Sequence, residues 1–272
     1  MKLEGKRILL TGASGGIGEA LAMELAAQGA HLLLHGRRAS ALERLRKELP
    51  HSERHQTVTA DLGSPQERAR LLQHPALEQG LDVLINSAGC NQFAWLEDQS
   101  GEQVTRQLLL NIEAPIQLTR ALLPRLRKPA VIMNIGSSLG AIGYAGYSVY
   151  CASKFALRGF SESLGRELEG TGIKVLHFAP RATRTHLNSE AAYAMNAELG
   201  THTDSPQDVA EEAVIALCNE TRRSWLGWPE KLFVRLNGLL PALVDRALAR
   251  QLPVIERHAR RPAHPATDHR SE

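Results

Sequence analysis

Short apolar segments that are typical of β-strands alternate with longer segments of helical periodicity along most of the chain. The expected strands cover residues 7–11, 31–35, 56–60, 81–86, 130–136 and 173–179. Expected helices fill the intervals, for example over 16–28, where Ile17, Leu21 and Leu25 lie four residues apart on one face. Strands that are apolar on both faces and alternate with helices form parallel βαβ units. We therefore expect an α/β fold with an open, doubly wound parallel sheet, in a single domain over residues 1–228.

The pattern changes after residue 228. From 229 to 252, apolar residues recur at steps of three and four positions among basic residues. The apolar positions are Leu232, Leu236, Leu239, Leu240, Leu243, Ala247 and Leu248, and the basic ones are Lys231, Arg235, Arg246 and Arg250. Pro241 should kink or split this segment. We expect an amphipathic helical extension over 229–256, followed by a disordered tail over 257–272 that is rich in His, Arg and Pro.

A basic amphipathic extension of this kind has several roles open to it. It can lie at a membrane surface as a peripheral contact through residues 229–252. It can equally pack on the domain, cover a pocket or contact another subunit. The sequence pattern leaves these alternatives open.

Composition narrows the functional classes. The chain has 272 residues, of which 43% are hydrophobic and 22% charged, as is typical of a globular protein. The net charge of +3 is too small a bias to indicate nucleic-acid binding. The three cysteines, Cys90, Cys151 and Cys218, lack the spacing of metal ligands, so we expect neither a metal site nor a disulfide framework. We see no signal peptide and no apolar run of the roughly 18 residues that a membrane span needs, so we expect a cytoplasmic protein.

A glycine-rich motif, Thr11-Gly12-Ala13-Ser14-Gly15-Gly16-Ile17-Gly18, directly follows the first strand and opens a helix. Gly12 permits the sharp turn out of the strand, Gly16 lets the backbone approach a pyrophosphate, and Gly18 lets the helix pack on the sheet. The start of the helix then presents free N–H groups to the anion. This context predicts a Rossmann-like dinucleotide site, in which the turn contributes Gly12, Ser14, Gly15, Gly16, Ile17 and Gly18. The alternative is a glycine-rich turn without a ligand.

The end of the second strand decides which dinucleotide such a site prefers. An NAD site usually has Asp or Glu there, which accepts a hydrogen bond from the ribose 2′-hydroxyl. This chain has Arg37 and Arg38 instead, and a guanidinium binds a 2′-phosphate that a carboxylate would repel. We expect NADP(H) as the cofactor, with Arg37 as the main contact and Arg38 as the second. The alternative places both arginines on the surface, in contact with solvent.

A candidate reactive pair lies in the helix expected over 150–168. Tyr150 and Lys154 are four residues apart, so both side chains lie on one helical face, where the ammonium would lower the pKa of the phenol. Such a phenol can pass a proton to or from a carbonyl or alcohol oxygen. Ser137 lies upstream at the carboxyl end of an expected strand, where its hydroxyl could hydrogen-bond the reacting oxygen. Taken alone, the Tyr-x-x-x-Lys spacing is more often a packing feature, and Ser138 is as good a candidate as Ser137.

Together, these motifs resemble the short-chain dehydrogenase/reductase (SDR) family, in the family's order, over about residues 5–225. The resemblance selects Ser137 over Ser138 and implies that Ser137, Tyr150 and Lys154 are catalytic. It also implies that Asn111 supports a proton-relay water, which makes Asn111 the fourth catalytic residue. Further cofactor contacts that it implies are Asp61, Leu62, Asn86, Ala88, Gly89, Tyr150, Lys154, Pro180, Thr183 and Thr185.

The chain departs from the family pattern after the sixth expected strand. Arg181 stands where such proteins usually have Gly, so a positive φ there would carry a penalty. Thr183 replaces an aliphatic residue whose backbone meets the cofactor's carboxamide, and backbone contacts can survive that change. Arg181 and Arg184 could attract an acidic substrate, or they face solvent.

The resemblance implies an NADP(H)-dependent oxidoreductase that transfers hydride between the nicotinamide and a carbonyl or secondary alcohol. The segment 184–205, which covers the substrate in the family, contains Leu187, Tyr193, Met195 and Leu199, so an apolar or lipid-like substrate is plausible. His186 and His202 fall in the same segment. Relatives are commonly homodimers or homotetramers. Two other hypotheses are a non-catalytic NADP-binding regulator and a protein whose C-terminal segment acts at a membrane surface.

Overall fold

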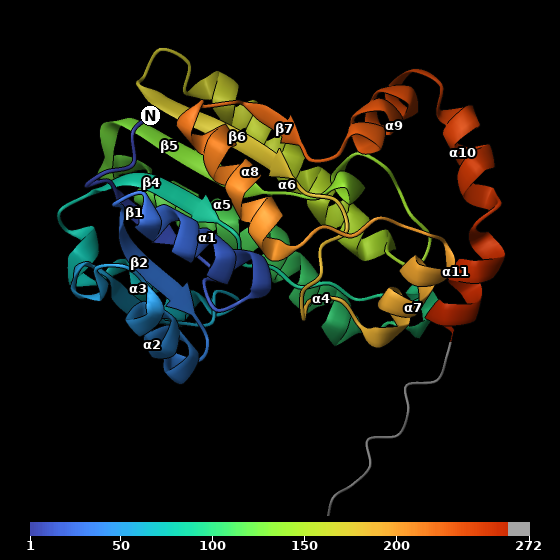
Figure 1. Ribbon diagram of the computed structural model, residues 1–272, viewed down its shortest axis with the longest axis horizontal. Helices are drawn as coiled ribbons and strands as arrows, with labels where there is room; N and C mark the ends of the chain where they lie inside the picture. The colour runs from blue at the N-terminus through green and yellow to red at the C-terminus, as the bar shows by residue number, and fades with distance from the viewer. Residues whose placement is uncertain (261–272) are drawn as a thin grey trace, which may run out of the picture.

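The computed structural model describes residues 1–260, apart from the side chains of Pro229 and Glu230. Within these residues, seven strands form one sheet in which every pairing is parallel. The strands are β1 (Arg7–Leu10), β2 (His31–Gly36), β3 (Gln56–Thr59), β4 (Leu81–Asn86), β5 (Leu126–Ile135), β6 (Ile173–Ala179) and β7 (Arg223–Trp225). Their order across the sheet is β3-β2-β1-β4-β5-β6-β7 (Figure 1). The order reverses between β1 and β4, which confirms the doubly wound, Rossmann-like sheet.

Helices cover both faces of this sheet. On one face lie α1 (Gly16–Ala27), α2 (Ala39–Glu48) and α8 (Pro206–Cys218). On the other lie α3 (Pro65–Leu72), α5 (Ala114–Leu122) and α6 (Ser148–Glu167), while α4 (Gly101–Leu108) contacts α6. Strand β1 shows why its sequence is apolar throughout, because Ile8 and Leu10 pack into the first layer and Leu9 into the second, each at most 1% exposed.

Two strands differ from the expectation. The edge strand β7 has three residues and includes Arg223 and Ser224, so it is too short and too polar to be recognised from its pattern. It is held by pairing with the carboxyl half of β6. Strand β5 begins at Leu126 rather than at residue 130, because Leu126 pairs with Leu81 ahead of an irregularity in the register.

Beyond β7 the chain forms three helices, α9 (Trp228–Leu239), α10 (Pro241–Ala249) and α11 (Leu252–Ala259). We call residues 228–259 the C-terminal arm. Pro241 begins α10, so the proline splits the segment, as the sequence suggests. Figure 1 shows α9 and α10 standing away from the sheet, while α11 returns to pack against α7 (Glu190–Glu198).

The arm extends further than the sequence suggests. Residues 257–259 belong to α11, although we placed them in the disordered tail. The rest of that expected tail, from 261 to 272, lies outside the described residues. Among the helices of the described chain, none combines the length and the apolar character needed to cross a bilayer.

Candidate active site

A cavity of about 1040 Å³ opens at the carboxyl ends of the strands. Residues that follow β1, β4, β5 and β6 line it, including Gly12, Ser87, Ser137 and Pro180. Doubly wound sheets bind ligands at this edge, where the strand order reverses. The cavity therefore brings the glycine-rich turn and the candidate catalytic residues to one place, although they lie far apart in the sequence.

The glycine-rich turn is shaped to hold an anion. Gly12 has φ +69°, and a Cβ atom there would come within 2.8 Å of the Ala88 backbone. A Cβ atom at Gly18 would lie 2.1 Å from the Gly12 carbonyl oxygen, so only glycine lets α1 begin so close to β1. Helix α1 has Gly15 as its N-cap, and no side chain caps its first N–H groups. These donors face the cavity, so the turn fits the pyrophosphate of a dinucleotide.

Arg37, Arg38, Asp61 and Leu62 line the same cavity near the ends of β2 and β3. Burial alone would raise the pKa of Asp61, but a hydrogen bond from the Gly63 amide and the nearby Arg106 and Arg37 guanidiniums lower it overall. The carboxylate is therefore ionised and partly neutralised by these two arginines. The positive charge of Arg37 and Arg38 fits a phosphate better than a bare hydroxyl.

One expected cofactor contact lies elsewhere. The side chain of Asn86 does not line the cavity. It is buried beneath it, where its amide nitrogen donates to Asn134 Oδ1 at 2.8 Å and to Thr119 Oγ1 at 3.2 Å. Asn86 thus joins β4 to β5 and α5. Its contact with the cofactor stays a prediction. Ala88 and Gly89, which follow it, do line the cavity.

Thr11 contributes to the site although we had assigned it no contact. Its hydroxyl oxygen accepts hydrogen bonds from the Ser87 and Ala88 amides at 3.0 and 3.1 Å. The hydroxyl also donates to the Ile85 carbonyl at 3.3 Å. Thr11 therefore holds the end of β4 against the glycine-rich turn. Its position at the head of the motif was the signal in the sequence.

Ser137, Tyr150 and Lys154 converge at the other end of the cavity. Ser137 follows β5, whereas Tyr150 and Lys154 lie one turn apart in α6. The Ser137 side chain lies near the Tyr150 phenol and lowers its pKa in part, and the Ser137 hydroxyl oxygen accepts a hydrogen bond from the Leu139 amide at 3.1 Å. The Lys154 Nζ atom donates to the Ile135 carbonyl at 3.0 Å and lies 5.7 Å from the centre of the Tyr150 ring. All three side chains are less than 10% exposed, so their chemistry takes place out of bulk water.

The electrostatics of this group differ in one respect from the expectation. Burial raises the pKa of Tyr150 to about 12, and the nearby Ser137 side chain offsets only part of that effect. Burial also lowers the pKa of Lys154 to about 8. We expected Lys154 to bring the pKa of Tyr150 below its usual value, and this is wrong because the ammonium points at the Ile135 carbonyl and loss of hydration dominates. At neutral pH the phenol is a proton donor.

Asn111 lies behind the catalytic group rather than in the cavity wall. It belongs to a π-helical turn, Leu109–Glu113, and is 1% exposed. Its side-chain oxygen accepts from the Cys90 amide at 2.9 Å, and its nitrogen donates to the Cys90 carbonyl at 2.8 Å and to Ser153 Oγ at 3.0 Å. Asn111 therefore joins the loop after β4 to α6 beside Lys154. Its role in proton relay remains a prediction.

The turn after β6 tolerates the departure from the family pattern. Pro180, Thr183 and Thr185 line the cavity as expected. Arg181 does not have a positive φ, so it carries no backbone penalty. Two of its nitrogens donate to the two oxygens of Asp204, each at 2.8 Å, and fasten this turn to the segment before α8.

Comparison with known proteins agrees with this geometry. The chain matches the short chain dehydrogenase family over residues 6–196. It is 34% identical over 259 residues to dehydrogenase/reductase SDR family member 7B of Bos taurus, covering 89% of this chain and 80% of that protein. A short chain dehydrogenase from Burkholderia cenocepacia J2315, crystallised in complex with NADP, is 30% identical with a TM-score of 0.73, over 83% of this chain and 97% of that chain.

A second solved structure shares the fold alone. It is an SDR from Burkholderia phymatum in complex with NAD, which has a TM-score of 0.79 but 21% identity, over 89% of this chain and 96% of that chain. The chain belongs to the short-chain dehydrogenase/reductase family. It is therefore an oxidoreductase of the kind that acts on an alcohol or carbonyl group and uses a nicotinamide cofactor.

In this SDR, the substrate end of the cavity is built from three separate parts of the chain. The loop before α6 contributes Leu139, Ile142, Tyr144 and Tyr147, and the segment after β6 contributes His186, Leu187 and Met195. The C-terminal arm contributes Phe233, Val244, Ala247, Leu248 and Gln251. His202, Tyr193 and Leu199 do not line the cavity, and Tyr193 instead donates to the Thr185 carbonyl at 2.7 Å. The wall is mostly apolar.

Two hydrogen bonds connect the arm to the loop before α6. The Tyr144 hydroxyl donates to Gln251 Oε1 at 2.7 Å, and Asn237 Nδ2 donates to the Ala141 carbonyl at 2.9 Å. The arm residues of the cavity wall were missed at the sequence level as individual contacts. The only signal was the helical periodicity of 229–252, which fits a pocket cover, a subunit contact and a membrane contact equally well.

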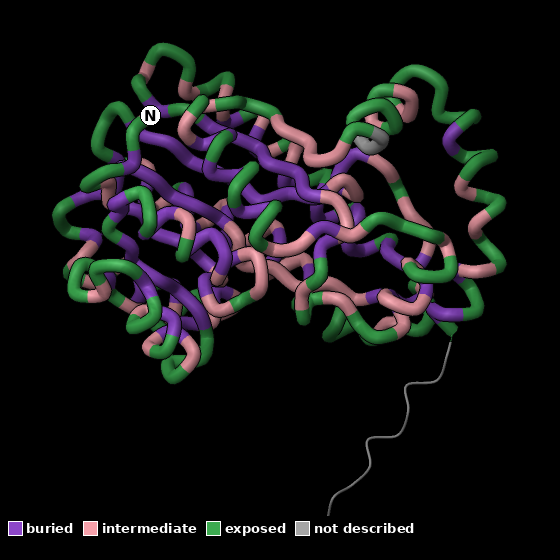
Figure 2. The backbone as a smooth tube through the Cα atoms, in the orientation of Figure 1, coloured by how far each residue is buried: buried purple, intermediate pink, exposed green. Residues whose placement is uncertain are grey.

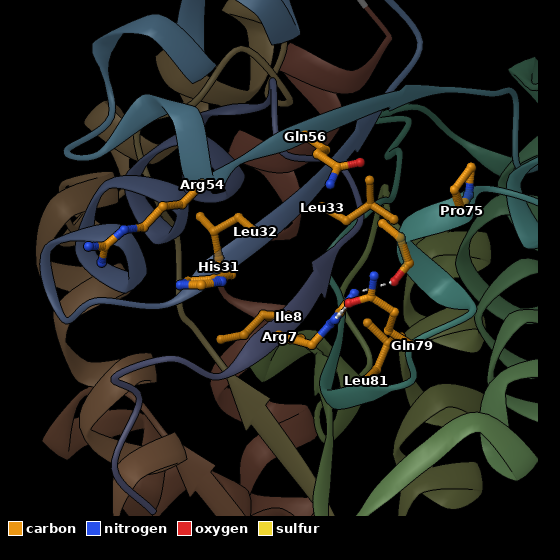
Figure 3. A pocket seen from close by; sticks show the side chains of 11 residues that line it. Arg7, Ile8, His31, Leu32, Leu33, Arg54, Gln56, Pro75, Gln79 and Leu81 are labelled. Atoms are coloured by element: carbon orange, nitrogen blue, oxygen red, sulfur yellow. Dashed lines mark hydrogen bonds between the residues drawn. The ribbon is translucent and has the colours of Figure 1, made fainter.

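A smaller cavity of about 240 Å³ lies at the amino ends of the strands, opposite the active site (Figure 3). Its most prominent polar group, Arg7, is engaged within the chain, because it donates to the Ala76 carbonyl at 2.7 Å and to the side chain of Gln79. His31 and Arg54 are also in its lining, which includes no Asp, Glu, Ser or Cys, and Arg54 pairs with Glu4 and Glu53 at 3.9 and 3.8 Å. This cavity does not carry the chemistry of the site.

Proposed function

We propose that this SDR is an NADP(H)-dependent oxidoreductase that interconverts a carbonyl and a secondary alcohol in an apolar, lipid-like substrate. The observation that carries the proposal is the single cavity that joins the uncapped start of α1 and the pair Arg37 and Arg38 to the Tyr150 hydroxyl. A cofactor bound along this cavity would be held at its phosphates by the glycine-rich turn and the Arg37 and Arg38 guanidiniums, and at its nicotinamide half by residues near Tyr150. The apolar wall beyond Tyr150 supports a substrate with a large apolar part.

Different residues of the site would bind different parts of the cofactor. The N–H groups of the glycine-rich turn would hold the pyrophosphate, Asp61 and Leu62 the adenine end, and Ala88, Gly89, Pro180, Thr183 and Thr185 the nicotinamide half. When bound, the nicotinamide supplies or accepts the hydride. Lys154 would hold the nicotinamide ribose.

Proton transfer falls to the chain's own residues. In reduction, the neutral Tyr150 phenol donates its proton to the carbonyl oxygen, and Ser137 hydrogen-bonds the same oxygen. The Lys154 ammonium favours the phenolate that remains, although it does not dominate the resting pKa of Tyr150. Asn111 ties α6 to the loop after β4 through Ser153 and Cys90, and it would help to return a proton to Tyr150. In oxidation, Tyr150 would act as the base.

The catalytic proposal is tested by Tyr150→Phe, which keeps the ring and removes the hydroxyl. We expect turnover of a carbonyl panel, followed by NADPH absorbance, to fall by about 100- to 10,000-fold. NADPH binding, measured by fluorescence titration, should stay within about twofold. Turnover at the parental rate would reject Tyr150 as the proton donor.

The preference for NADP(H) rests on Arg37 and Arg38. The related structures include complexes with NADP and with NAD, so family membership leaves the choice to these side chains. We expect Arg37→Ala to weaken NADPH binding by about 10- to 100-fold, because a charge-assisted hydrogen bond is lost, and to leave NADH binding unchanged. Arg44→Ala is the matched control, since Arg44 is an exposed arginine of α2 outside the cavity. Equal loss for NADPH and NADH would contradict the proposal.

A non-catalytic NADP-binding regulator is the competing function. It predicts a disabled position in the catalytic group, yet Ser137, Tyr150 and Lys154 are all present and line the same cavity. The structure therefore favours an enzyme. We further propose that the protein is cytoplasmic and forms a homodimer or homotetramer. Light scattering of the purified chain measures its molar mass and so tests the oligomeric state.

A further inference from the structure

The C-terminal arm exposes an unusual amount of apolar surface. Twelve large apolar side chains are exposed in the described residues, and seven of them belong to the arm: Trp228, Leu232, Phe233, Leu239, Leu240, Leu243 and Leu252. The other five, Met23, Leu96, Phe155, Leu187 and Ile215, are spread over the preceding residues. Single exposed apolar residues are ordinary, whereas a cluster on one element marks an interaction surface.

Within the arm, apolar and cationic side chains share the same side of each helix. In α9, Trp228, Leu232, Arg235 and Leu239 are spaced by four, three and four residues, which places them in one stripe. Leu243 and Arg246 in α10 and Arg250 at its C-cap follow the same rule. We call these seven residues the arm face. Figure 2 shows most residues of α9 and α10 as exposed, and Trp228 and Leu239 are 71% and 78% exposed.

The cations of the arm are not neutralised by neighbouring side chains. Lys231, Arg235, Arg246 and Arg250 make no ion pair within 4.0 Å in the described part of the chain. By contrast, Arg257 pairs with Glu198 at 2.7 Å, and Arg260 with Glu97 at 3.1 Å. The arm, residues 228–259, has three acidic residues, Glu230, Asp245 and Glu256, against five Lys and Arg residues, so the arm is net cationic.

The combination of exposed apolar side chains with unpaired cations favours one kind of partner over the others. A second copy of the chain, related by a two-fold axis, would bring each arginine of the face against the same cationic patch. The chain's own residues 261–272 contain no large apolar side chain that could cover the face. An anionic lipid surface satisfies both features, because Trp and Leu enter the interfacial region while Arg and Lys meet the headgroups.

We propose that the arm face is the surface by which this protein docks on an anionic lipid bilayer. The inner side of α10 lines the catalytic cavity with Val244, Ala247 and Leu248, so docking brings the apolar end of that cavity close to the lipid. An apolar substrate dissolved in the bilayer would then reach the cavity without crossing water. The docking itself does not depend on the catalytic proposal.

The test is co-sedimentation of the full chain with vesicles of phosphatidylcholine alone or mixed with phosphatidylglycerol. We expect binding to the anionic vesicles that weakens as salt rises, and little binding to the neutral ones. Arg246→Glu with Arg250→Glu should weaken binding by at least about 25-fold, since each cation near the surface contributes about fivefold. Leu239→Ser with Leu243→Ser should weaken it by at least about tenfold, because two buried apolar side chains are lost.

Matched variants outside the arm control for the effects of net charge and of exposed apolar surface on vesicle binding. Arg44→Glu with Arg70→Glu reverses two exposed cations of α2 and α3, and Met23→Ser with Ile215→Ser removes two exposed apolar side chains of α1 and α8. Both pairs should bind vesicles like the parent. Trp228 is a built-in reporter, because its emission should shift to the blue on binding, and Trp228→Phe should remove that shift.

Several results would overturn the proposal. Equal binding to neutral and anionic vesicles, or equal loss in the control pairs, would show that the arm face is not the docking surface. Absence of vesicle binding together with a change of mass by light scattering in the arm variants would make the face a subunit interface. Circular dichroism of each variant separates loss of binding from loss of fold, and none of these measurements uses NADPH turnover.

Discussion

The cofactor side and the substrate side of the active site are built in different ways. The cofactor side consists of turns that directly follow the central strands, and each turn is held by backbone geometry, as at Gly12 and Gly18. The substrate side includes helices from the end of the chain. Helices α9 and α10 pack against each other, and Asn237 of α9 donates a hydrogen bond to the Ala141 carbonyl in the loop before α6. The cofactor side is therefore part of the sheet's edge, whereas the substrate side includes helices that lie outside the sheet.

This difference has a functional consequence. The cofactor side must present the same atoms to the same dinucleotide in every catalytic cycle, so its groups lie on strand ends that cannot move independently. For the apolar substrate that we propose, the substrate side needs a shape that accepts and releases a larger molecule, and helices outside the sheet can differ between relatives without disturbing the cofactor. The comparison predicts that substitutions on the two sides will fail in different ways.

The largest effect is expected from Gly18→Ala on the cofactor side. A methyl group there would lie 2.1 Å from the Gly12 carbonyl oxygen, so the turn or α1 must shift, at a cost of about 3 kcal/mol in the free energy of unfolding. Gly159→Ala is the matched control, because no atom lies within 4 Å of that position on α6, and it should stabilise the protein by about 1 kcal/mol. Urea unfolding of both variants measures the difference. Similar stabilities would show that the turn is not tightly held.

The next effect concerns pH, where the two sides meet at Tyr150 and Lys154. Burial places the pKa of Lys154 at about 8 and that of Tyr150 at about 12. Carbonyl reduction needs a charged lysine and a neutral phenol, so kcat/KM should fall about tenfold per pH unit above pH 8, while the phenol keeps its proton. A profile that stays flat to pH 10 would contradict this assignment of the charged group.

The same lysine makes a matching prediction for stability. Its pKa is lower in the folded chain than its usual value of 10.5, so the unfolded state binds more protons between pH 8 and 10.5. The contribution of this group to stability therefore increases as pH rises through that range. Thermal unfolding of the parent and of Lys154→Met should show the parent gaining stability relative to the variant above pH 8.

The smallest effect is expected on the substrate side. Val244 is 5% exposed and lines the cavity from α10, so Val244→Trp should fill part of the substrate end. We expect kcat/KM for a long-chain ketone to fall about tenfold, whereas that for a small ketone and the affinity for NADPH stay within about twofold. Leu243→Trp, one position away and 61% exposed, is the control that should leave both ketones unaffected in the absence of lipid. Equal loss for both ketones would make the arm part of the cofactor side.

Some of the site was predictable because the signals are local. Gly12, Gly16 and Gly18 stand at fixed offsets after an apolar strand, and Tyr150 and Lys154 are one helical turn apart. Asn86 shows the limit of such reasoning, since its place in the motif does not reveal that its side chain enters a buried hydrogen-bond network with Thr119 and Asn134. The direction of a side chain depends on what packs against its strand, and a linear pattern does not contain that.

Only the resemblance to the SDR family singled out Ser137, Tyr150 and Lys154 as the candidate catalytic residues. The amino-acid sequence by itself determined the parallel sheet, the glycine-rich turn, the pair of arginines after β2 and the one-turn spacing of Tyr150 and Lys154. These features follow from periodicity and short spacings, which the backbone converts directly into geometry. Only the tertiary structure decided that the arm closes the substrate end, that Arg181 is held by Asp204, and that burial makes Tyr150 a weak acid. Each of these depends on groups that are distant in the chain and meet only when it folds, and on the water that folding removes.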